Sequence, residues 1–188
     1  MNKRLIAATS FIFCTVLTLA IMLACSDDGS KSSSSSDNSE NSDKAKVEVK
    51  LPKIGEMVKA EKFEFTITSV TTSTKVGSEY LDEKAPEGAL FLILNYKSKN
   101  ITKETMSSSD IPKIKKIIDP NGTSYSEASS ATMYYKAAKG IDEKIISKLN
   151  PGITEKSAVV FEVSSDLWKE KGWKAIVDAD DDLEFEIK

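Results

Sequence analysis

The sequence predicts an all-β chain that folds as an immunoglobulin-like antiparallel β-sandwich, on three observations. Apolar and polar residues alternate over residues 63–70 and again over residues 183–187, which is the pattern of strands with one solvated face. Residues 89–94 and 158–163 are almost wholly apolar, as in strands that are covered on both faces. Turn signals separate these segments, and short strands joined by turns are typical of a sandwich.

The shorter strands and the turns follow from local composition. Strands are expected at residues 114–118 and 173–177, with a weaker one at residues 145–149. Turns are expected at Asp119-Pro120-Asn121-Gly122 and at Asn150-Pro151-Gly152. Pro fits the second position of a turn, and Gly accepts positive φ.

Two further segments indicate helix. Residues 165–172 predict one or two helical turns, with Ser165 as the cap in front and Gly172 as the cap behind. Residues 127–139 have the composition of a short helix, but their position between strands fits a long loop equally well.

The composition allows one folded domain and removes several classes of function. Residues 46–188 are enough to bury about two-thirds of their unfolded surface in one core. The net charge of −3 becomes −5 if Lys3 and Arg4 leave with the first 24 residues. A mildly acidic chain is a poor partner for nucleic acid, so we expect no nucleic-acid binding. The chain has no His, which removes Ser-His and Cys-His catalysis and most catalytic zinc sites.

The first 25 residues have the features of an exported chain. Lys3 and Arg4 precede an apolar stretch that ends in Ala24-Cys25. This junction resembles the lipobox of bacterial lipoprotein signal peptides, which implies cleavage before Cys25 and acylation of that residue, for example with palmitate. The alternative is an uncleaved transmembrane anchor, since about 20 apolar residues also span a bilayer. Both interpretations place the domain outside the cytoplasm, attached to the cell membrane or the outer membrane.

The residues that follow the junction predict a disordered tether. Ser, Asp, Asn, Glu, Lys and Gly make up almost all of residues 26–45, and such a segment cannot bury apolar surface. The sequence therefore divides into a signal peptide at 1–24, a lipidated Cys with a Ser/Asp-rich tether at 25–45, and a sandwich domain at 46–188.

Four local patterns, in order along the chain, resemble one known family. They are Gly55-Glu56-Met57-Val58 before the alternating strand, the apolar strand 89–97 ending near Asn100, the turn residues Asp119, Gly122 and Tyr125, and Leu149 with Pro151-Gly152 before residues 159–163. The chain is similar here to bacterial extracytoplasmic lipoproteins with a telokin-like, immunoglobulin-like domain. The resemblance implies a β-sandwich and export, and it brings no catalytic residues.

Four aromatic residues are candidates for contact with a partner. Tyr134 and Tyr135 are adjacent in the least patterned stretch, where both cannot easily pack inward, so we expect at least one to be exposed. Trp168 and Trp173 flank Gly172 and could anchor a partner if they are exposed. The alternative for the two tryptophans is packing at the end of the sandwich core.

The acidic run at residues 178–184 is a candidate metal site. Asp178, Asp180 and Asp182 have the alternating spacing that begins an EF-hand loop, and calcium prefers several oxygen ligands. Leu183 replaces the required Gly, however, so an EF-hand is excluded. Calcium binding would need carboxylates from other loops, such as Asp119 or Asp142. The alternative is a solvated turn whose charges protect the adjacent edge strand.

These observations favour a non-catalytic binding or interaction module of the cell envelope. The membrane is reached through the lipid anchor, an envelope protein is a possible partner, and no cofactor is expected. An enzyme would need a nucleophile beside a base, or two carboxyls held at a defined separation, and no pattern in the sequence places such a pair. The second hypothesis is a calcium-binding or small-ligand-binding domain that uses residues 178–182.

Overall fold

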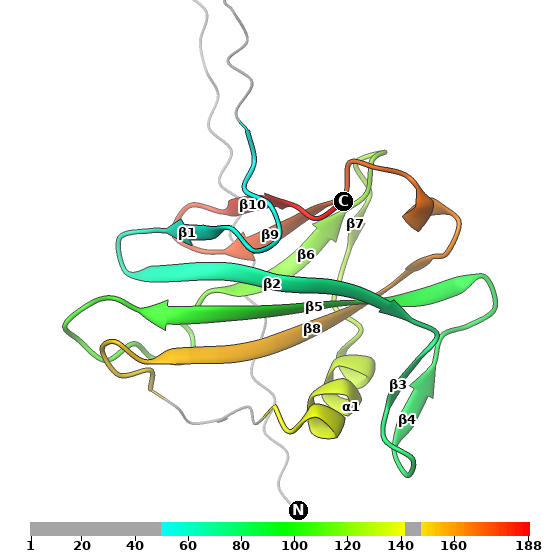
Figure 1. Cartoon of the computed structure of the whole chain (residues 1–188), viewed down its shortest axis with the longest axis horizontal. Coiled ribbons are helices and arrows are strands. Elements are labelled where there is room, and N and C mark those ends of the chain that lie inside the picture. The colour runs from blue at the N-terminus through cyan, green and yellow to red at the C-terminus, as the bar shows by residue number, and fades with distance from the viewer. Residues whose placement is uncertain (1–49, 142–147) are drawn as a thin grey trace, which may run out of the picture. The chain divides into compact units, whose positions relative to one another are not determined.

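The computed structural model describes residues 50–141 and 148–188 (Figure 1). The expected signal peptide and tether, and most of the weak strand expected at residues 145–149, lie outside the described residues. Two four-stranded antiparallel sheets pack face to face. The first has the order β1 (Met57–Lys59), β2 (Phe63–Ser73), β5 (Ala89–Asn100) and β8 (Thr154–Ser164). The second has the order β10 (Leu183–Glu186), β9 (Lys174–Asp178), β6 (Lys113–Ile118) and β7 (Ser124–Tyr125).

Three smaller elements complete the domain. They are a hairpin of β3 (Lys75–Gly77) and β4 (Asp82–Lys84), the helix α1 (Ser129–Lys139) and a single 3₁₀ turn, η1 (Leu167–Lys169). The prediction of an antiparallel β-sandwich is confirmed. Every strand expected within the described residues is present, although β9 begins one residue later than expected.

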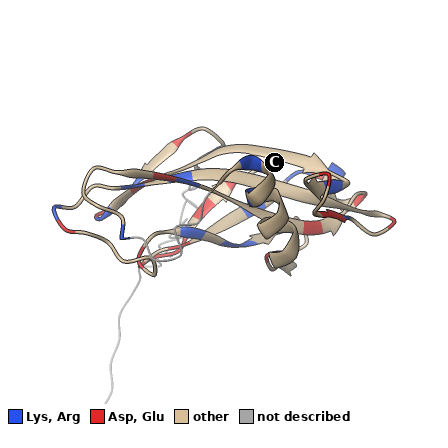
Figure 2. Cartoon of the chain, turned by 90° about the horizontal axis from the view of Figure 1, so that it is seen from below, with Lys and Arg blue, Asp and Glu red and all other residues tan. Residues whose placement is uncertain are grey.

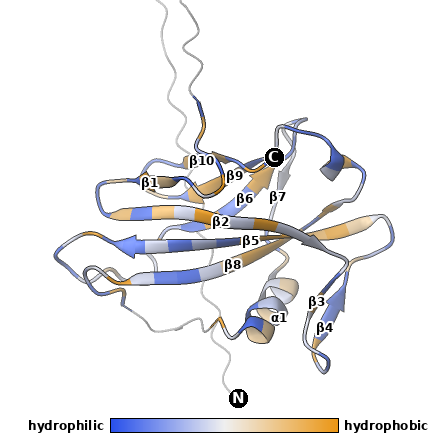
Figure 3. Cartoon of the chain, viewed as in Figure 1, coloured by the Kyte–Doolittle hydropathy of each residue, from blue (hydrophilic) through white to orange (hydrophobic). Residues whose placement is uncertain are grey.

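The main core lies between the two sheets. Alternation along β2 sends Phe63, Phe65 and Ile67 inward, and Figure 3 shows hydrophobic and hydrophilic residues alternating along this strand. The inner face of the first sheet meets Ile117, Val177 and other apolar residues of the second. Phe65 contacts both sheets, with its ring centroid 5.3 Å from that of Tyr96 and 5.7 Å from that of Phe185.

The strand β5 is buried on both faces, as its continuous apolar run predicts. Leu92 and Leu94 point into the core between the sheets. Phe91 and Ile93 point to the opposite face, where they pack with Val76 of the β3–β4 hairpin and with α1. The helix and the hairpin therefore form a third layer over the part of the outer face that holds Phe91 and Ile93.

The segment 127–139 is helical, which decides between the two alternatives for it. The helix begins at Ser129 and ends at Gly140, which adopts a left-handed conformation with φ of 62°. Its first turn is bonded to the edge of β8. The Ala128 N–H donates to the Val160 carbonyl at 2.8 Å, and the Val160 N–H donates to the Thr132 hydroxyl at 2.9 Å.

The expected caps of the segment 165–172 are wrong. The only helical turn there is η1, which is three residues long and has Asp166 before it. The Leu167 N–H donates to the Ser164 hydroxyl at 3.4 Å, so Ser164 rather than Ser165 reaches the turn. Gly172 lies three residues beyond the end of η1 and takes positive φ where the chain enters β9.

The turn after β6 is organised by one buried carboxylate. Asp119 is 3% exposed, and its Oδ1 accepts the N–H groups of Asn121 at 2.9 Å and Thr123 at 2.8 Å. Its Oδ2 accepts the Tyr125 hydroxyl at 3.1 Å. Burial alone would raise the pKa of Asp119, but the hydrogen bonds from Thr123, Tyr125 and Asn121 outweigh it and lower the pKa below the ordinary value.

We predict that Asp119 makes the stability of the domain depend on pH. A carboxyl whose pKa is lower in the folded state stabilises the fold above its unfolded pKa, near 4, and this contribution is lost as the pH falls through the folded pKa. In Asp119→Asn the amide replaces the carboxylate, so thermal unfolding at about pH 7 should occur at a lower Tm than in the parent chain. The Tm difference should shrink below about pH 4. Exposed Asp181→Asn is the control, and a Tm difference for Asp119→Asn that does not change with pH would contradict this role.

Candidate functional site

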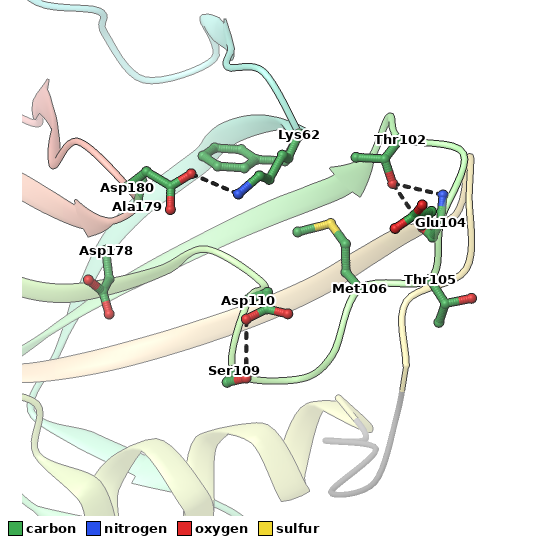
Figure 4. Close-up of a pocket in the computed structure, with 11 residues that line it drawn as sticks. Lys62, Thr102, Glu104, Thr105, Met106, Ser109, Asp110, Asp178, Ala179 and Asp180 are labelled. Atoms are coloured by element: carbon green, nitrogen blue, oxygen red, sulfur yellow. Dashed lines mark hydrogen bonds and ion pairs between the residues drawn. The ribbon is translucent and has the colours of Figure 1, made fainter.

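A cleft of about 450 Å³ lies at one end of the sandwich, where three loops meet (Figure 4). We call it the end cleft. The turn between β1 and β2, the loop between β5 and β6, and the loop between β9 and β10 form its walls. It is lined by Lys62, Phe63, Thr102, Glu104, Thr105, Met106, Ser109, Asp110, Asp178, Ala179 and Asp180. Loops gathered at one end of a rigid sandwich are a common place for binding sites.

The end cleft combines apolar residues with an acidic rim. Phe63 and Met106 are each 6% exposed, and both belong to buried apolar clusters. Four carboxylates line the cleft, all from exposed residues: Glu104, Asp110, Asp178 and Asp180. Lys62 supplies the one ammonium group among the lining residues. The excess of carboxylates favours a ligand that carries positive charge.

Lys62 and Asp180 form an ion pair across the cleft. The Lys62 Nζ lies 3.0 Å from the Asp180 Oδ2, and Figure 4 shows the two side chains pointing toward one another. The hydrogen bond to Asp180, with the attraction of that carboxylate, raises the pKa of Lys62. Both side chains are more than half exposed, so the pair adds little to stability and can separate when a ligand enters.

Asp110 is held ionised by local hydroxyl groups. The Ser107 hydroxyl donates to the Asp110 Oδ2 at 2.7 Å, and the Ser109 hydroxyl donates to the Oδ1 at 3.3 Å. These bonds, with that of Ser107 the largest cause, lower the pKa of Asp110 below its ordinary value. The carboxylate therefore presents a full negative charge to the cleft at neutral pH.

The buried side chain of Asn100 shapes the loop between β5 and β6. Its Nδ2 donates to the carbonyls of Glu104 at 2.7 Å and Leu149 at 2.8 Å. Its Oδ1 accepts from the N–H and the hydroxyl of Thr102, both at 2.8 Å. Asn100 is 0% exposed, so this amide fixes one wall of the end cleft from within.

The acidic run divides between the end cleft and the surface of the second sheet. Asp178 and Asp180 line the cleft, whereas the Asp182 Oδ2 pairs with the Lys115 Nζ at 2.7 Å. Asp178 also lies 3.8 Å from that Nζ. Among the described residues, no group of three His, Cys, Asp or Glu side chains is placed to hold a metal ion. Asp119 is committed to its own turn, and Asp142 lies outside the described residues. Calcium binding therefore stays a prediction that this geometry does not support.

The tyrosine pair lies on α1 rather than on a loop. At least one of Tyr134 and Tyr135 was expected to be exposed, and both are half-buried. The Tyr135 hydroxyl donates to the Asn95 Oδ1 at 3.3 Å, and the Asn95 Nδ2 donates to the Ser69 hydroxyl at 3.1 Å. Tyr135 thereby lines a shallow polar groove of about 650 Å³ beside β2. Contact of either tyrosine with a partner stays a prediction.

The tryptophans pack at the other end of the core, which was the alternative for them. Trp173 is 0% exposed, and its Nε1 donates to the Leu167 carbonyl at 3.3 Å. Trp173 thus offers no surface to a partner, and the contact hypothesis is corrected for this residue. Trp168 is half-buried against it, with ring centroids 5.2 Å apart, and the Lys188 Nζ lies 4.5 Å from the centroid of Trp168.

The charged residues of the rest of the domain are mixed. Figure 2 shows basic and acidic residues interspersed along the strands and loops. Over residues 50–141 and 148–188, no helix has the length and apolar character that crossing a membrane requires.

Comparison with known proteins places the chain in a family. Residues 52–171 match the model of a domain of unknown function, DUF4352. The chain belongs to the DUF4352 family. The uncharacterized protein YxkC of Bacillus subtilis (strain 168) is 38% identical over 122 residues, which are 64% of this chain and 67% of that relative.

Solved structures show the same fold as this DUF4352 domain. The crystal structure of a conserved hypothetical protein from Bacillus anthracis has a TM-score of 0.62 and 24% identity, and the match covers 71% of this chain and 94% of that one. The yjhA protein from Bacillus subtilis has a TM-score of 0.50 and 16% identity, with 73% of this chain and 100% of that one covered. The family match ends at residue 171, so Asp178 and Asp180 lie beyond it, whereas the other two walls of the end cleft lie within it.

We predict that Asn100→Ala lowers the free energy of unfolding by about 1–3 kcal/mol, because the Thr102 N–H loses its acceptor and the Glu104 and Leu149 carbonyls each lose one of their two donors. Chemical denaturation followed by tryptophan fluorescence measures the change. Asn121→Ala is the matched control, since Asn121 is exposed and takes part in its turn through its main chain. Equal stability of the Asn100 and Asn121 variants would show that Asn100 does not support the loop.

Proposed function

We propose that this DUF4352 protein is a lipid-anchored extracytoplasmic lipoprotein whose sandwich is a non-catalytic binding module. The end cleft is its ligand site in this proposal. The observation that carries the proposal is the meeting of three loops around a cleft with buried apolar residues and four carboxylates. The membrane anchor rests on the Ala24-Cys25 junction and on the polar residues that follow it.

The composition of the end cleft favours an alkyl amine, or a lysine side chain of a partner protein. An ammonium group can be paired by Asp110 and Asp178, and the ion pair of Lys62 with Asp180 shows a resident ammonium group already held there. An alkyl stem can lie on Phe63 and Met106, which close the cleft on the side of the core. A small ligand of this class and an envelope protein with an exposed lysine share the same chemistry at the cleft.

The anchor predicts that Cys25→Ala is no longer acylated. In bacterial cells producing the full chain, an alkyne-bearing palmitate analogue should label the parent chain and not the variant. The parent should sediment with the membrane fraction, and Cys25→Ala should either lose this association or keep an uncleaved signal peptide with no label. A control such as Ser26→Ala keeps the cysteine and should still be labelled. Equal labelling of parent and Cys25→Ala would overturn the lipoprotein assignment.

The cleft predicts that carboxylates in its lining, and not their neighbours, determine binding of an amine. The probe is 1,5-diaminopentane, measured by calorimetry on the full chain in detergent. We expect Asp178→Asn with Asp180→Asn to weaken binding about tenfold, since two attractive charges are removed. Asp181→Asn with Asp182→Asn is the matched control, because it also removes two charges from the same loop and neither residue is in the lining.

Three results of that titration separate the hypotheses. Absence of heat with the diamine in the parent chain would refute an amine site in the end cleft. Equal weakening by Asp181→Asn with Asp182→Asn would mean that only net charge matters and that the cleft is not the site. Heat with millimolar calcium, abolished by Asp182→Asn, would favour the calcium hypothesis, because Asp182 lies outside the cleft.

A further inference from the structure

The strand β2 has an open edge along its second half. The strand β1 pairs only with residues 64–66 of β2, and the Gly55 N–H extends this contact to the Ile67 carbonyl. From Ser69 to Ser73 the strand is paired with β5 on one side. On its other side, no strand of the described part of the chain pairs with it. We call residues 69–73 the open edge.

The other long edges of the sandwich carry a covering segment at some positions or charged side chains, such as Glu155 and Lys156 of β8, and this sets the open edge apart. The first turn of α1 bonds to Val160 on the edge of β8 through both the N–H and the carbonyl. The Pro52 carbonyl accepts the N–H of Glu186 on the edge of β10 at 2.9 Å. Soluble proteins protect sheet edges with such covers, with charged side chains or with proline. The open edge has none of these devices in its own sequence, Ser69-Val70-Thr71-Thr72-Ser73.

The open edge is regular and accessible. A bulge at Thr68 interrupts β2 just before it, and beyond the bulge the register with β5 runs unbroken from Ser69 opposite Asn95 to Ser73 opposite Phe91. Thr71 and Thr72 are exposed, and the other three residues are half-exposed. Val and Thr favour extended backbone, so the segment is ready to accept another strand over a length of about 17 Å.

We propose that the open edge pairs antiparallel with the same edge of a second copy of this chain, to give an eight-stranded sheet across a two-fold axis. The axis passes beside Thr71, so Ser69 of one copy lies opposite Ser73 of the other and Val70 lies opposite Thr72. The segment is uncharged, so this pairing brings no like charges together, and hydroxyl-bearing pairs of this kind stabilise antiparallel strands. Two-fold contacts between identical surfaces are the commonest way in which soluble chains associate.

The elements that flank the open edge leave room for this partner. The contacts of β1 and Gly55 stop at Ile67, which lies opposite position 75 of the second copy in this register. The chain leaves the line of β2 there, since Thr74 and Ala85 close the base of the β3–β4 hairpin and the hairpin packs toward α1. Figure 1 shows the hairpin turning away from the end of β2. In this register the β3–β4 hairpin of one copy therefore does not occupy the space that β1 of the other copy needs.

Disulfide crosslinking in cells that make the full chain tests the pairing. Directly opposed residues of antiparallel strands have Cα atoms about 4.5–5.5 Å apart, within the range of a disulfide. Under mild oxidation we expect most Thr71→Cys chains to migrate as dimers, above the level given by the parent chain with its own two cysteines. Thr154→Cys is the matched control, because Thr154 is exposed on the other edge strand, β8, and should give only the parent level.

The register gives a sharper test. Chains with Ser69→Cys should crosslink to differently tagged chains with Ser73→Cys, and each variant alone should crosslink far less. A Thr71→Cys thiol that reacts with a maleimide reagent but forms no dimer would overturn the proposal. Crosslinking of Thr71→Cys to a protein of another mass would also overturn it, in favour of a foreign strand.

Association in detergent solution provides an independent measurement. Thr71→Lys places two ammonium groups opposite one another at the two-fold axis, so sedimentation should show a monomer where the parent chain is a dimer. Thr154→Lys adds the same charge away from the axis and should stay dimeric. An unchanged Tm in both variants confirms that they fold. Dimers that persist in Thr71→Lys would refute pairing through this edge.

Discussion

The burial of β5 on both faces is the constraint on which the rest of the domain depends. One half of its apolar run, Leu92 and Leu94, is buried against the second sheet, as in any sandwich. The other half, Phe91 and Ile93, would face water in a two-layer protein. The chain therefore has to supply a third layer, and it does so with α1 and with the β3–β4 hairpin, which places Val76 on the same cluster.

The end cleft depends on the C-terminal end of β5. Asn100 is the last residue of β5, and its amide holds both the loop that follows and the Leu149 carbonyl ahead of β8. Met106, Ile111 and Leu149 form a small buried cluster of their own next to this amide. The end of β5 thus positions the carboxylates of a loop that has no regular secondary structure between Ile101 and Pro112.

The parts of the fold that depend on local pattern could be predicted from the sequence. The alternation of apolar and polar residues predicts β2 and β10, and the apolar run of β5 predicts its burial on both faces. The residue types at positions 119–122 predict the turn there. The strands β1, β3, β4 and β7 could not be predicted, because each has only two or three residues and is fixed by the strand with which it pairs. Composition alone leaves helix and loop open at residues 127–139. The hydrogen bonds that join this segment to Val160 of β8 link residues distant in sequence, and a local pattern does not show them.

The candidate site was predictable only in part. Asp178 and Asp180 were identified from their spacing, but spacing could not show that lysines from distant segments, Lys62 and Lys115, lie against that run. Glu104, Met106 and Asp110 carried no sequence signal, because they become neighbours of Asp178 only when the two sheets pack. Among the aromatic candidates, Trp173 is corrected because a large apolar side chain packs in a core as readily as on a surface, and the sequence does not distinguish the two.

The attachment of α1 to β8 has a consequence for the life of the protein in the cell. The same few residues of the helix satisfy the strand edge at Val160 and cover Phe91 with Ala131. A local opening of this one helix would therefore release an apolar sheet face and an unpaired strand together, while both sheets stay intact. Such a partly opened species is what chaperones and proteases recognise and what aggregates grow from. Protection of the folded protein therefore requires the docking of these eleven residues as well as the packing of the two sheets.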